Sequence, residues 1–313
     1  MEPSKHSRLD GHFRLRLVRR LLAVCTGATI LFCLISWSSA FAGGQRDLSI
    51  RVLTSIDDHF WTNSVIIEGP HQVMLVDAQL TKTNADRVLQ EIKRTNKPLS
   101  IIYITHEHAD HFIGLEVFKE AYPRVRVIAT SAVAGRIAQV YQEKIDKWKR
   151  LLGSAATSHV VAIGQFDRPV ITFEGSRIEV LKRIRGDTDQ NTMLWIPGQR
   201  TLIAGDVVFN NMHVYTAETD SKARGTWLNS LRTIRELHPS VVVPGHSNTG
   251  APLDASTAVD FTESYLLAFE KELAKARDPD GLINALKNRY PSAELLLALE
   301  RGAMANVNSE KRH

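Results

Sequence analysis

The chain has 313 residues, 43% of them hydrophobic, and a formal net charge of +5 at neutral pH, values typical of a globular protein of one large or two modest domains. The positive charge belongs largely to the first 42 residues, which hold six Lys and Arg against two Asp and Glu, so that residues 43–313 carry +1. This balance gives no sign of a nucleic-acid partner.

The first 42 residues predict a secretory signal peptide. The basic pair Arg19-Arg20 precedes an apolar run from Leu21 to about Ile35, and Ala40-Phe41-Ala42 supplies the small residues of a cleavage site. An uncleaved membrane anchor is the alternative, because residues 21–42 are nearly long enough to span a bilayer. Arg19-Arg20 also permits twin-arginine export. We therefore expect a periplasmic or secreted protein with no stable membrane insertion after cleavage.

Both cysteines of the chain, Cys25 and Cys33, lie in this leader. Residues 43–313 can therefore form no disulfide and offer no thiolate ligand. Neither cysteine follows the small residue that a lipoprotein site requires. Stability outside the cytoplasm must come from the core and from any bound metal.

Residues 43–313 are expected to form one domain, whose core spans about 48–250. Strand-like runs at 48–53, 64–68 and 73–77 predict a meander. Phe60 and Trp61 lie in the first connecting loop, where they either pack beneath it or line a substrate groove. A helix follows from about Thr83 and ends at Lys97-Pro98.

The next segment, residues 105–114, carries the strongest chemical signal. It follows the apolar strand 101–104, and three histidines and two carboxylates fall within six of its positions. Imidazoles and carboxylates are ligands of first-row metals, and alternate positions at a strand end project to the same side. Because one ion cannot easily use His106, His108, Asp110 and His111 together, the spacing favours two metals roughly 3.5–4 Å apart. The alternative is a histidine-rich solvated turn.

These residues resemble the His-x-His-x-Asp-His signature of the metallo-β-lactamase superfamily. The resemblance covers about residues 48–250 and implies an α/β fold, a four-layer αββα sandwich with metals at the strand ends between the sheets. It also implies that Asp77, which ends its strand, supports the metal ligands from behind.

The middle of the chain continues the alternation of helices and strands. Residues 131–152 have helical spacing, and we favour a sheet-covering helix over a lid on the site. His159, in the polar loop that follows, is not expected to touch the site. Strands are expected at 170–173, 178–181, 192–196, 201–204 and 241–243, with a helix near 227–234.

Two further ligands are implied by the resemblance. His246, in Pro244-Gly245-His246, matches the histidine that would hold the second metal with Asp110 and His111. Asp206, in Ala-Gly-Asp, matches the aspartate that bridges both metals.

The third ligand of the first metal departs from the family pattern. Where the family usually has Gly-His-Thr, this chain has Gly186-Asp187-Thr188. We expect Asp187 to join His106 and His108, a set of two histidines and a carboxylate that is chemically sound. Asp189 and His213 are alternatives, as is an enzyme that uses one metal.

The implied activity is hydrolysis of a small-molecule substrate. A metal-bridging hydroxide would attack an ester, thioester, lactone or lactam carbonyl, and Asp110 or water would protonate the departing atom. The layout favours the glyoxalase II-like or quinoprotein-associated hydrolases. Two divalent ions are expected, with zinc first and iron or manganese as alternatives because Asp187 adds negative charge. The rival hypotheses are an iron-dependent oxidoreductase, similar to the persulfide dioxygenases, and a non-catalytic metal-binding protein.

The end of the chain predicts a helical tail over about 255–303, with breaks near 278–281 and at Pro291. Such a tail either packs on the domain or pairs subunits in a homo-oligomer. Residues 304–313 are expected to form a frayed end.

Overall fold

The structure is a computed structural model that describes residues 48–56 and 60–310. The expected signal peptide, residues 1–42, lies outside these ranges and stays a prediction. Among the described residues, no helix combines the length and the apolar character needed to cross a bilayer.

Two β-sheets form the centre of the compact unit Gln45–His313. The first sheet has the strand order β1-β2-β3-β4-β5-β6, antiparallel over its first three strands and parallel beyond them. Its strands are β1 (Ser49–Thr54), β2 (Asn63–Glu68), β3 (Val73–Val76), β4 (Leu99–Tyr103), β5 (Arg126–Ala129) and β6 (Gly164–Gln165). The meander expected at its start is confirmed.

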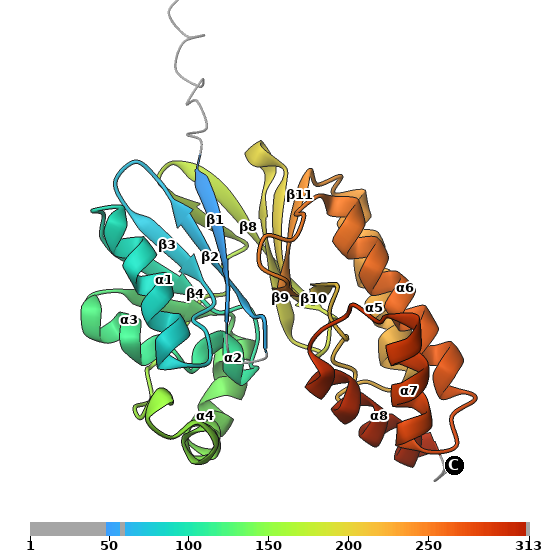
Figure 1. The fold of residues 1–313 in the computed structure, drawn as a ribbon. Coiled ribbons are helices and arrows are strands. Elements are labelled where there is room, and N and C mark those ends of the chain that lie inside the picture. The colour runs from blue at the N-terminus through green and yellow to red at the C-terminus, as the bar shows by residue number, and fades with distance from the viewer. Residues whose placement is uncertain (1–47, 57–59, 311–313) are drawn as a thin grey trace, which may run out of the picture. The chain divides into compact units, whose positions relative to one another are not determined.

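The second sheet has the order β11-β10-β9-β8-β7 and is antiparallel except for the pair β10 and β11. Its strands are β7 (Val170–Phe173), β8 (Ser176–Ile184), β9 (Asn191–Ile196), β10 (Thr201–Asn210) and β11 (Val241–Ser247). Helices cover the outer faces of both sheets (Figure 1). They are α1 (Lys82–Arg94), α2 (Ala109–Phe112), α3 (Leu115–Ala121), α4 (Ser131–Leu152), α5 (Ser221–Glu236), α6 (Ala255–Leu273), α7 (Pro279–Arg289) and α8 (Leu296–Glu310).

Strand alternation explains why the protein has four layers. In β2, Val65 and Ile67 face the apolar layer between the two sheets, whereas Ile66 faces the helices. Met74 and Leu75 of β3 divide in the same way. Because successive side chains of a strand point to opposite faces, a sheet buried on both sides needs apolar residues at every position. The expected αββα sandwich with a helical tail is confirmed.

Helix α4 spans the expected residues and has two roles. Thr130 caps its N-terminus by accepting a hydrogen bond from the backbone N–H of Val133, and Ile137, Tyr141 and Ile145 are buried against the first sheet. The favoured interpretation, a sheet-covering helix, therefore describes its apolar face. The same helix also contributes Lys144, Lys147 and Trp148 to a pocket.

Strands β10 and β11 are longer than expected. We expected Asp206 and His246 to follow the ends of short strands, but both residues lie inside strands that continue to Asn210 and Ser247. The pairing register of β10 and β11 shifts between Ile203 and Gly205 and again before Phe209. Such irregularities re-aim side chains within a strand, and they have no clear signature in the sequence.

Gly245 allows the close approach of these two strands. A Cβ atom at this position would lie 1.9 Å from Oδ1 of Asp206, a distance that excludes any side chain. The glycine therefore brings the backbone of β11 directly against the Asp206 carboxylate.

The helical tail is longer than expected, because α8 continues to Glu310. The prediction of a frayed end from residue 304 is thus wrong for 304–310, and residues 311–313 lie outside the described ranges. Asn306 and Val307 are 4% and 2% exposed, so α8 is packed on the domain as far as Val307. That the tail also pairs subunits stays a prediction.

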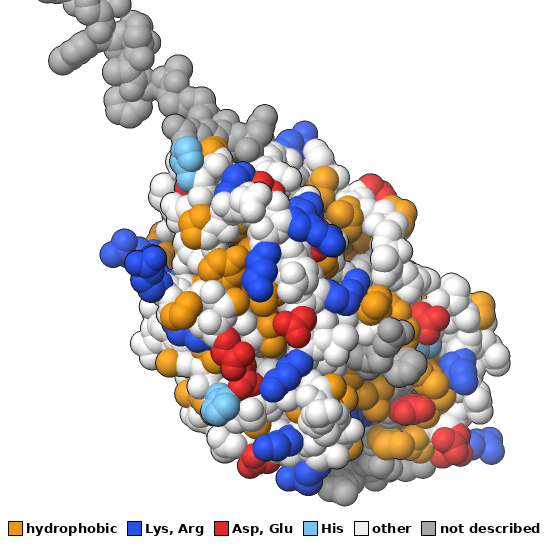
Figure 2. Space-filling model, turned by 60° about the vertical axis from the view of Figure 1, so that its left-hand side comes forward, with side chains coloured by type: hydrophobic (Ala, Val, Ile, Leu, Met, Phe, Trp, Pro, Cys, Tyr) orange, Lys and Arg blue, Asp and Glu red, His pale blue; other side chains and the backbone are white. Residues whose placement is uncertain are grey.

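The surface in Figure 2 carries Lys and Arg side chains scattered among acidic and apolar ones, with no continuous basic field on that face. This distribution agrees with the near-neutral charge of residues 43–313. The absence of a nucleic-acid partner stays a prediction.

Candidate metal centre

The loop after β4 is held in place by Asp77. The Asp77 carboxylate accepts hydrogen bonds from the backbone N–H of Thr105 at 2.9 Å and from its hydroxyl at 2.8 Å. Asp77 itself has a positive φ of 59°, which turns the chain as it leaves β3. Helix α2 then begins at Ala109 and places Asp110 and His111 in its first turn. A buried carboxylate therefore fixes the direction in which the histidine cluster leaves the sheet.

The first ligand group contains His106, His108, Asp187 and Asp206, whose ligand atoms all lie within 4.8 Å of one another. Nδ1 of His108 is 2.7 Å from Oδ2 of Asp187, and Nε2 of His106 is 3.9 Å from the same oxygen. This is the set expected for the first metal, with Asp187 in the position where the family has histidine.

The second ligand group contains Asp110, His111 and His246, which meet the same 4.8 Å limit. Nε2 of His111 and Nε2 of His246 each lie 3.5 Å from Oδ2 of Asp110. All three side chains are buried, and they come from α2 and β11.

Asp206 lies between the two groups. Its Oδ2 is 3.6 Å from Nε2 of His106 and 3.0 Å from Nε2 of His246, while its Oδ1 is 3.2 Å from Nε2 of His111. One carboxylate therefore reaches histidines of both groups, as the bridging position requires.

Several buried atoms at this point make no well-aligned hydrogen bond in the described structure, although two pairs of ligand atoms lie only 2.7 Å and 3.2 Å apart. They are Nε2 of His106, Nε2 of His111, Oδ2 of Asp187 and Oδ1 of Asp206. Leaving one such atom unsatisfied costs roughly 1–3 kcal/mol, so four that converge on one place call for a common partner. Two imidazole nitrogens and two carboxylate oxygens suit divalent metal ions, and the residues present fit the implied metals.

The other nitrogen of each histidine is also engaged. Nδ1 of His111 lies 2.8 Å from Asp77, Nδ1 of His246 lies 2.6 Å from the carbonyl of Phe60, and Nε2 of His108 lies 3.2 Å from Glu218. Nδ1 of His106 lies 3.0 Å from the Thr105 hydroxyl. Carboxylate and carbonyl oxygens only accept, and the Thr105 hydroxyl donates its own hydrogen to Asp77. In the neutral histidines these nitrogens therefore carry the proton and leave the opposite lone pair directed into the centre.

The two alternatives to Asp187 lie elsewhere. Asp189 is exposed on the surface. His213 is buried away from the centre, with its Nδ1 2.9 Å from the Tyr265 hydroxyl, and burial lowers its pKa to about 4. His159, which was not expected at the site, pairs with Glu116 on the surface.

Charges in the metal-free centre depend on the competition between burial and ion pairing. Burial alone would lower the pKa of His111, but Asp206, Asp110 and Asp77 together raise it well above its usual value. His246 behaves similarly because of Asp206. Burial raises the pKa of Asp187 to about 6, against the opposing charge of His108. Without metal, protons therefore provide part of the positive charge that this cluster of carboxylates requires.

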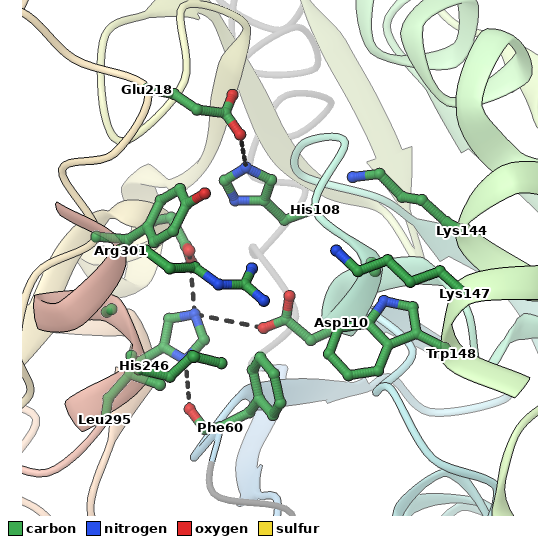
Figure 3. A pocket seen from close by; sticks show the side chains of 15 residues that line it. Phe60, His108, Asp110, Lys144, Lys147, Trp148, Glu218, His246, Leu295 and Arg301 are labelled. Atoms are coloured by element: carbon green, nitrogen blue, oxygen red, sulfur yellow. Dashed lines mark hydrogen bonds and ion pairs between the residues drawn. The ribbon is translucent and has the colours of Figure 1, made fainter. Parts of the chain in front are cut away.

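A pocket of about 260 Å³ opens over the centre (Figure 3). Its metal-centre side is formed by His108, Asp110, Asp206 and His246. The remaining lining residues include Phe60, Lys144, Lys147, Trp148, Tyr215, Glu218, Leu295, Leu297, Ala298 and Arg301. Phe60 thus lines a groove, whereas Trp61 packs against the core of the second sheet.

Several of the residues in and around the pocket could not be predicted from the local sequence pattern. Nothing in the local pattern distinguishes Lys147 from the other lysines of α4, and Arg301 lies in a tail of unknown placement. Glu218 is an isolated polar residue in a loop, and Thr62, whose hydroxyl lies 2.7 Å from Oδ2 of Asp110, is another beside β2. Phe60 is the exception, because a position in a substrate groove was one of the two expectations for its loop.

Comparisons with known proteins agree with this geometry. Residues 60–246 match the family model described as the metallo-beta-lactamase superfamily. A metallo-beta-lactamase type 2 of Bacillus cereus is 21% identical over 195 residues, covering 60% of this chain and 68% of the relative. A linear primary-alkylsulfatase of a Pseudomonas species is 24% identical over 230 residues, but this match spans only 42% of that protein.

Solved structures show the same fold. A metallo-beta-lactamase family protein from Thermus thermophilus superimposes with a TM-score of 0.57 at 20% identity, over 81% of this chain and 92% of that one. At this identity the likeness concerns the fold alone. The family match, which covers more than half of the sequence, shows that the chain belongs to the metallo-β-lactamase superfamily.

Proposed function

We propose that this protein is an exported, metal-dependent hydrolase that cleaves an ester, thioester, lactone or lactam. The observation that carries the proposal is the position of Asp206, which belongs to the first ligand group and also contacts His111 and His246 of the second, beside a pocket. Divalent ions bound there would lower the pKa of a water molecule and polarise a substrate carbonyl. Zinc is the first candidate, with iron and manganese as alternatives.

Asp110 is the candidate for the residue that protonates the departing atom of the substrate. The Thr62 hydroxyl donates a hydrogen bond of 2.7 Å to its Oδ2, which fixes the carboxylate at the edge of the pocket. Burial would raise the pKa of Asp110, but His111 and His246 outweigh it and lower the pKa. An ionised carboxylate held in this way can take a proton and return it to the departing atom.

The test begins with protein purified without added metal, followed by metal analysis. The zinc-loaded protein is then assayed on ester, thioester, lactone and lactam substrates, and on sulfate esters because of the alkylsulfatase similarity. We expect about two metals per chain and turnover that Asp206→Ala removes. Turnover that survives in Asp206→Ala would contradict a reaction at this centre.

Asp187 favours a second candidate, an iron-dependent oxidoreductase on the same fold. A carboxylate in place of a histidine adds a hard oxygen donor and a negative charge to the first group, both of which suit iron. A protein that purifies with predominantly iron and consumes oxygen with its substrate would replace the hydrolase proposal.

A non-catalytic metal-binding protein is distinguished by two variants. If Asp187→His raises turnover of generic esters or lactams, while Asp110→Ala changes nothing measurable in the parent, the natural chain is a binding protein. The hydrolase proposal expects the reverse, with turnover in the parent that Asp110→Ala reduces.

A further inference from the structure

We propose that the pocket selects a substrate with an apolar body and a separate anionic group, and that Lys147 and Arg301 bind this group. The assignment rests on the proposed hydrolase for the chemistry at the metals. It goes beyond that proposal in naming the substrate class and the residues that recognise it.

The two cations reach into the pocket from opposite walls (Figure 3). Lys147 belongs to α4, on the side of the first sheet, and Arg301 belongs to α8, on the side of the second. Both line the same pocket as Asp110 and His246. A ligand seated over the metal centre would therefore lie between them.

Neither cation is neutralised by an acidic side chain of the described chain. Within the described residues, Lys147 and Arg301 form no ion pair, and their neighbours are the ring of Trp148 and the hydroxyl of Tyr215. Lys144 differs, since its ammonium donates to the carbonyl of Glu107 at 2.9 Å and has a structural partner. Two like charges that face one cavity, each without an acidic partner of its own, are the expected pattern of an anion-binding site.

The carboxylates that line the pocket already have partners. Asp206 lies between the histidines of the centre, Asp110 accepts from Thr62, and Glu218 contacts His108. Asp187 further adds a negative charge where the family pattern has a neutral histidine. The metal centre therefore attracts an anion less strongly, and the two wall cations supply the attraction.

Arg301 is placed by a rigid part of α8. The next residue, Gly302, packs so closely on Thr216 that a Cβ atom would lie 2.3 Å from its hydroxyl oxygen. Asn306, one turn later, donates to the Thr216 carbonyl at 3.0 Å and accepts from the buried Arg224 at 2.6 Å. These contacts fix α8 against the loop after β10, so Arg301 is presented at a defined point of the pocket.

Much of the remaining wall is apolar, although Lys144, Tyr215 and Glu218 also line it. Phe60 and Trp148 meet edge to face, with ring centroids 5.4 Å apart, and Leu295, Leu297 and Ala298 complete the surface. Aromatic and aliphatic walls with few charged groups are typical of sites for small organic ligands. The occupant is therefore an organic anion with an apolar part, such as a carboxylate or a sulfonate.

A binding experiment tests this without requiring turnover. Zinc-loaded protein is titrated calorimetrically with phenylbutanesulfonate, phenylbutyrate and the uncharged phenylbutanol. The sulfonate is a weak metal ligand, so its binding reports the wall cations rather than the metals. We expect both anions to bind about tenfold or more tightly than the alcohol, the equivalent of one charged hydrogen bond.

The variants Lys147→Ala and Arg301→Ala should each weaken sulfonate binding about tenfold and leave alcohol binding unchanged. Lys149→Ala, on the exposed side of the same helix, is the matched control and should change neither. Arg301→Lys should restore part of the loss, because the charge returns without the planar guanidinium.

Equal affinity for the sulfonate and the alcohol would overturn the assignment. Equal losses of affinity for both ligands in Arg301→Ala would also overturn it, because they would indicate lost packing rather than a lost charge. Binding of the carboxylate alone, insensitive to both variants, would place the anion on the metals and also overturn it. A protein that binds the sulfonate through both cations but hydrolyses nothing would contradict only the proposed hydrolase. One that hydrolyses neutral esters without any preference for anions would contradict only the role of the cations.

Discussion

The two ligand groups differ in how their histidines are supported. His111 and His246 are held from behind by Asp77 and by the Phe60 carbonyl, and their side chains are 0% and 4% exposed. His108 is held by Glu218, whose side chain is 46% exposed. Since solvent competes for an exposed contact, His108 of the first group is less rigidly supported than both histidines of the second. The departure from the family pattern, Asp187, also falls in the first group.

The largest loss of bound metal is expected for Asp206, the residue that contacts both ligand groups. Asp206→Ala should remove a ligand from both groups, so that bound metal falls below one ion per chain and any turnover falls by about a hundredfold or more. Metal analysis after dialysis measures the first quantity. The exposed Asp189→Ala is the matched control and should retain both metals, and a fully loaded Asp206→Ala protein would show that Asp206 is not a ligand.

Asp77→Ala should act mainly on the second group. It removes the acceptor of His111 and leaves the buried N–H and hydroxyl of Thr105 without their partner, at a cost of about 1–3 kcal/mol in the free energy of unfolding. We expect metal affinity to fall about tenfold to a hundredfold. Competition with a chelator measures the affinity, and Asp86→Ala on the exposed face of α1 is the control. A loss of stability with unchanged affinity would restrict Asp77 to folding.

Metal affinity is expected to depend on pH, because ligands of both groups hold protons when no metal is bound. The raised pKa values of His111 and His246, and the pKa of Asp187 at about 6, mean that protons occupy the metal-free centre at acidic pH. Metal must displace them, so affinity should fall as the pH falls, by about tenfold per pH unit for each proton released. Calorimetry in buffers of different ionisation enthalpy counts these protons. Equal affinity from about pH 8 to about pH 6 would contradict the raised pKa values.

The smallest loss of metal affinity is expected for Glu218, the exposed residue that contacts His108 of the first group. Glu218→Gln keeps the shape of the side chain but removes the charge beside His108, and should weaken metal binding by only about two- to fivefold. If Glu218→Gln loses as much metal affinity as Asp77→Ala in the same chelator assay, or more, then His108 is not the less firmly supported histidine.

Much of the fold could be predicted because its signals are local. The strands β2, β3 and β4 are apolar at successive positions, and the face that each residue occupies follows from strand alternation. The ligands His106, His108, Asp110 and His111 are close in sequence, so their proximity needs only one turn of chain. The extension of α8 was missed because Asn306 is a polar residue near the chain end, and its burial depends on Arg224, which lies in another helix.

By itself, the sequence determined the kind of centre: a strand followed by histidines and carboxylates, with two later residues in matching local contexts. Only the tertiary structure brings Asp187, rather than Asp189 or His213, next to His106 and His108, and brings Lys147 and Arg301 to opposite walls of one pocket. The physical reason is distance along the chain. Spacing within one turn fixes neighbouring side chains, whereas residues on opposite sheets meet only through the packing of the whole core.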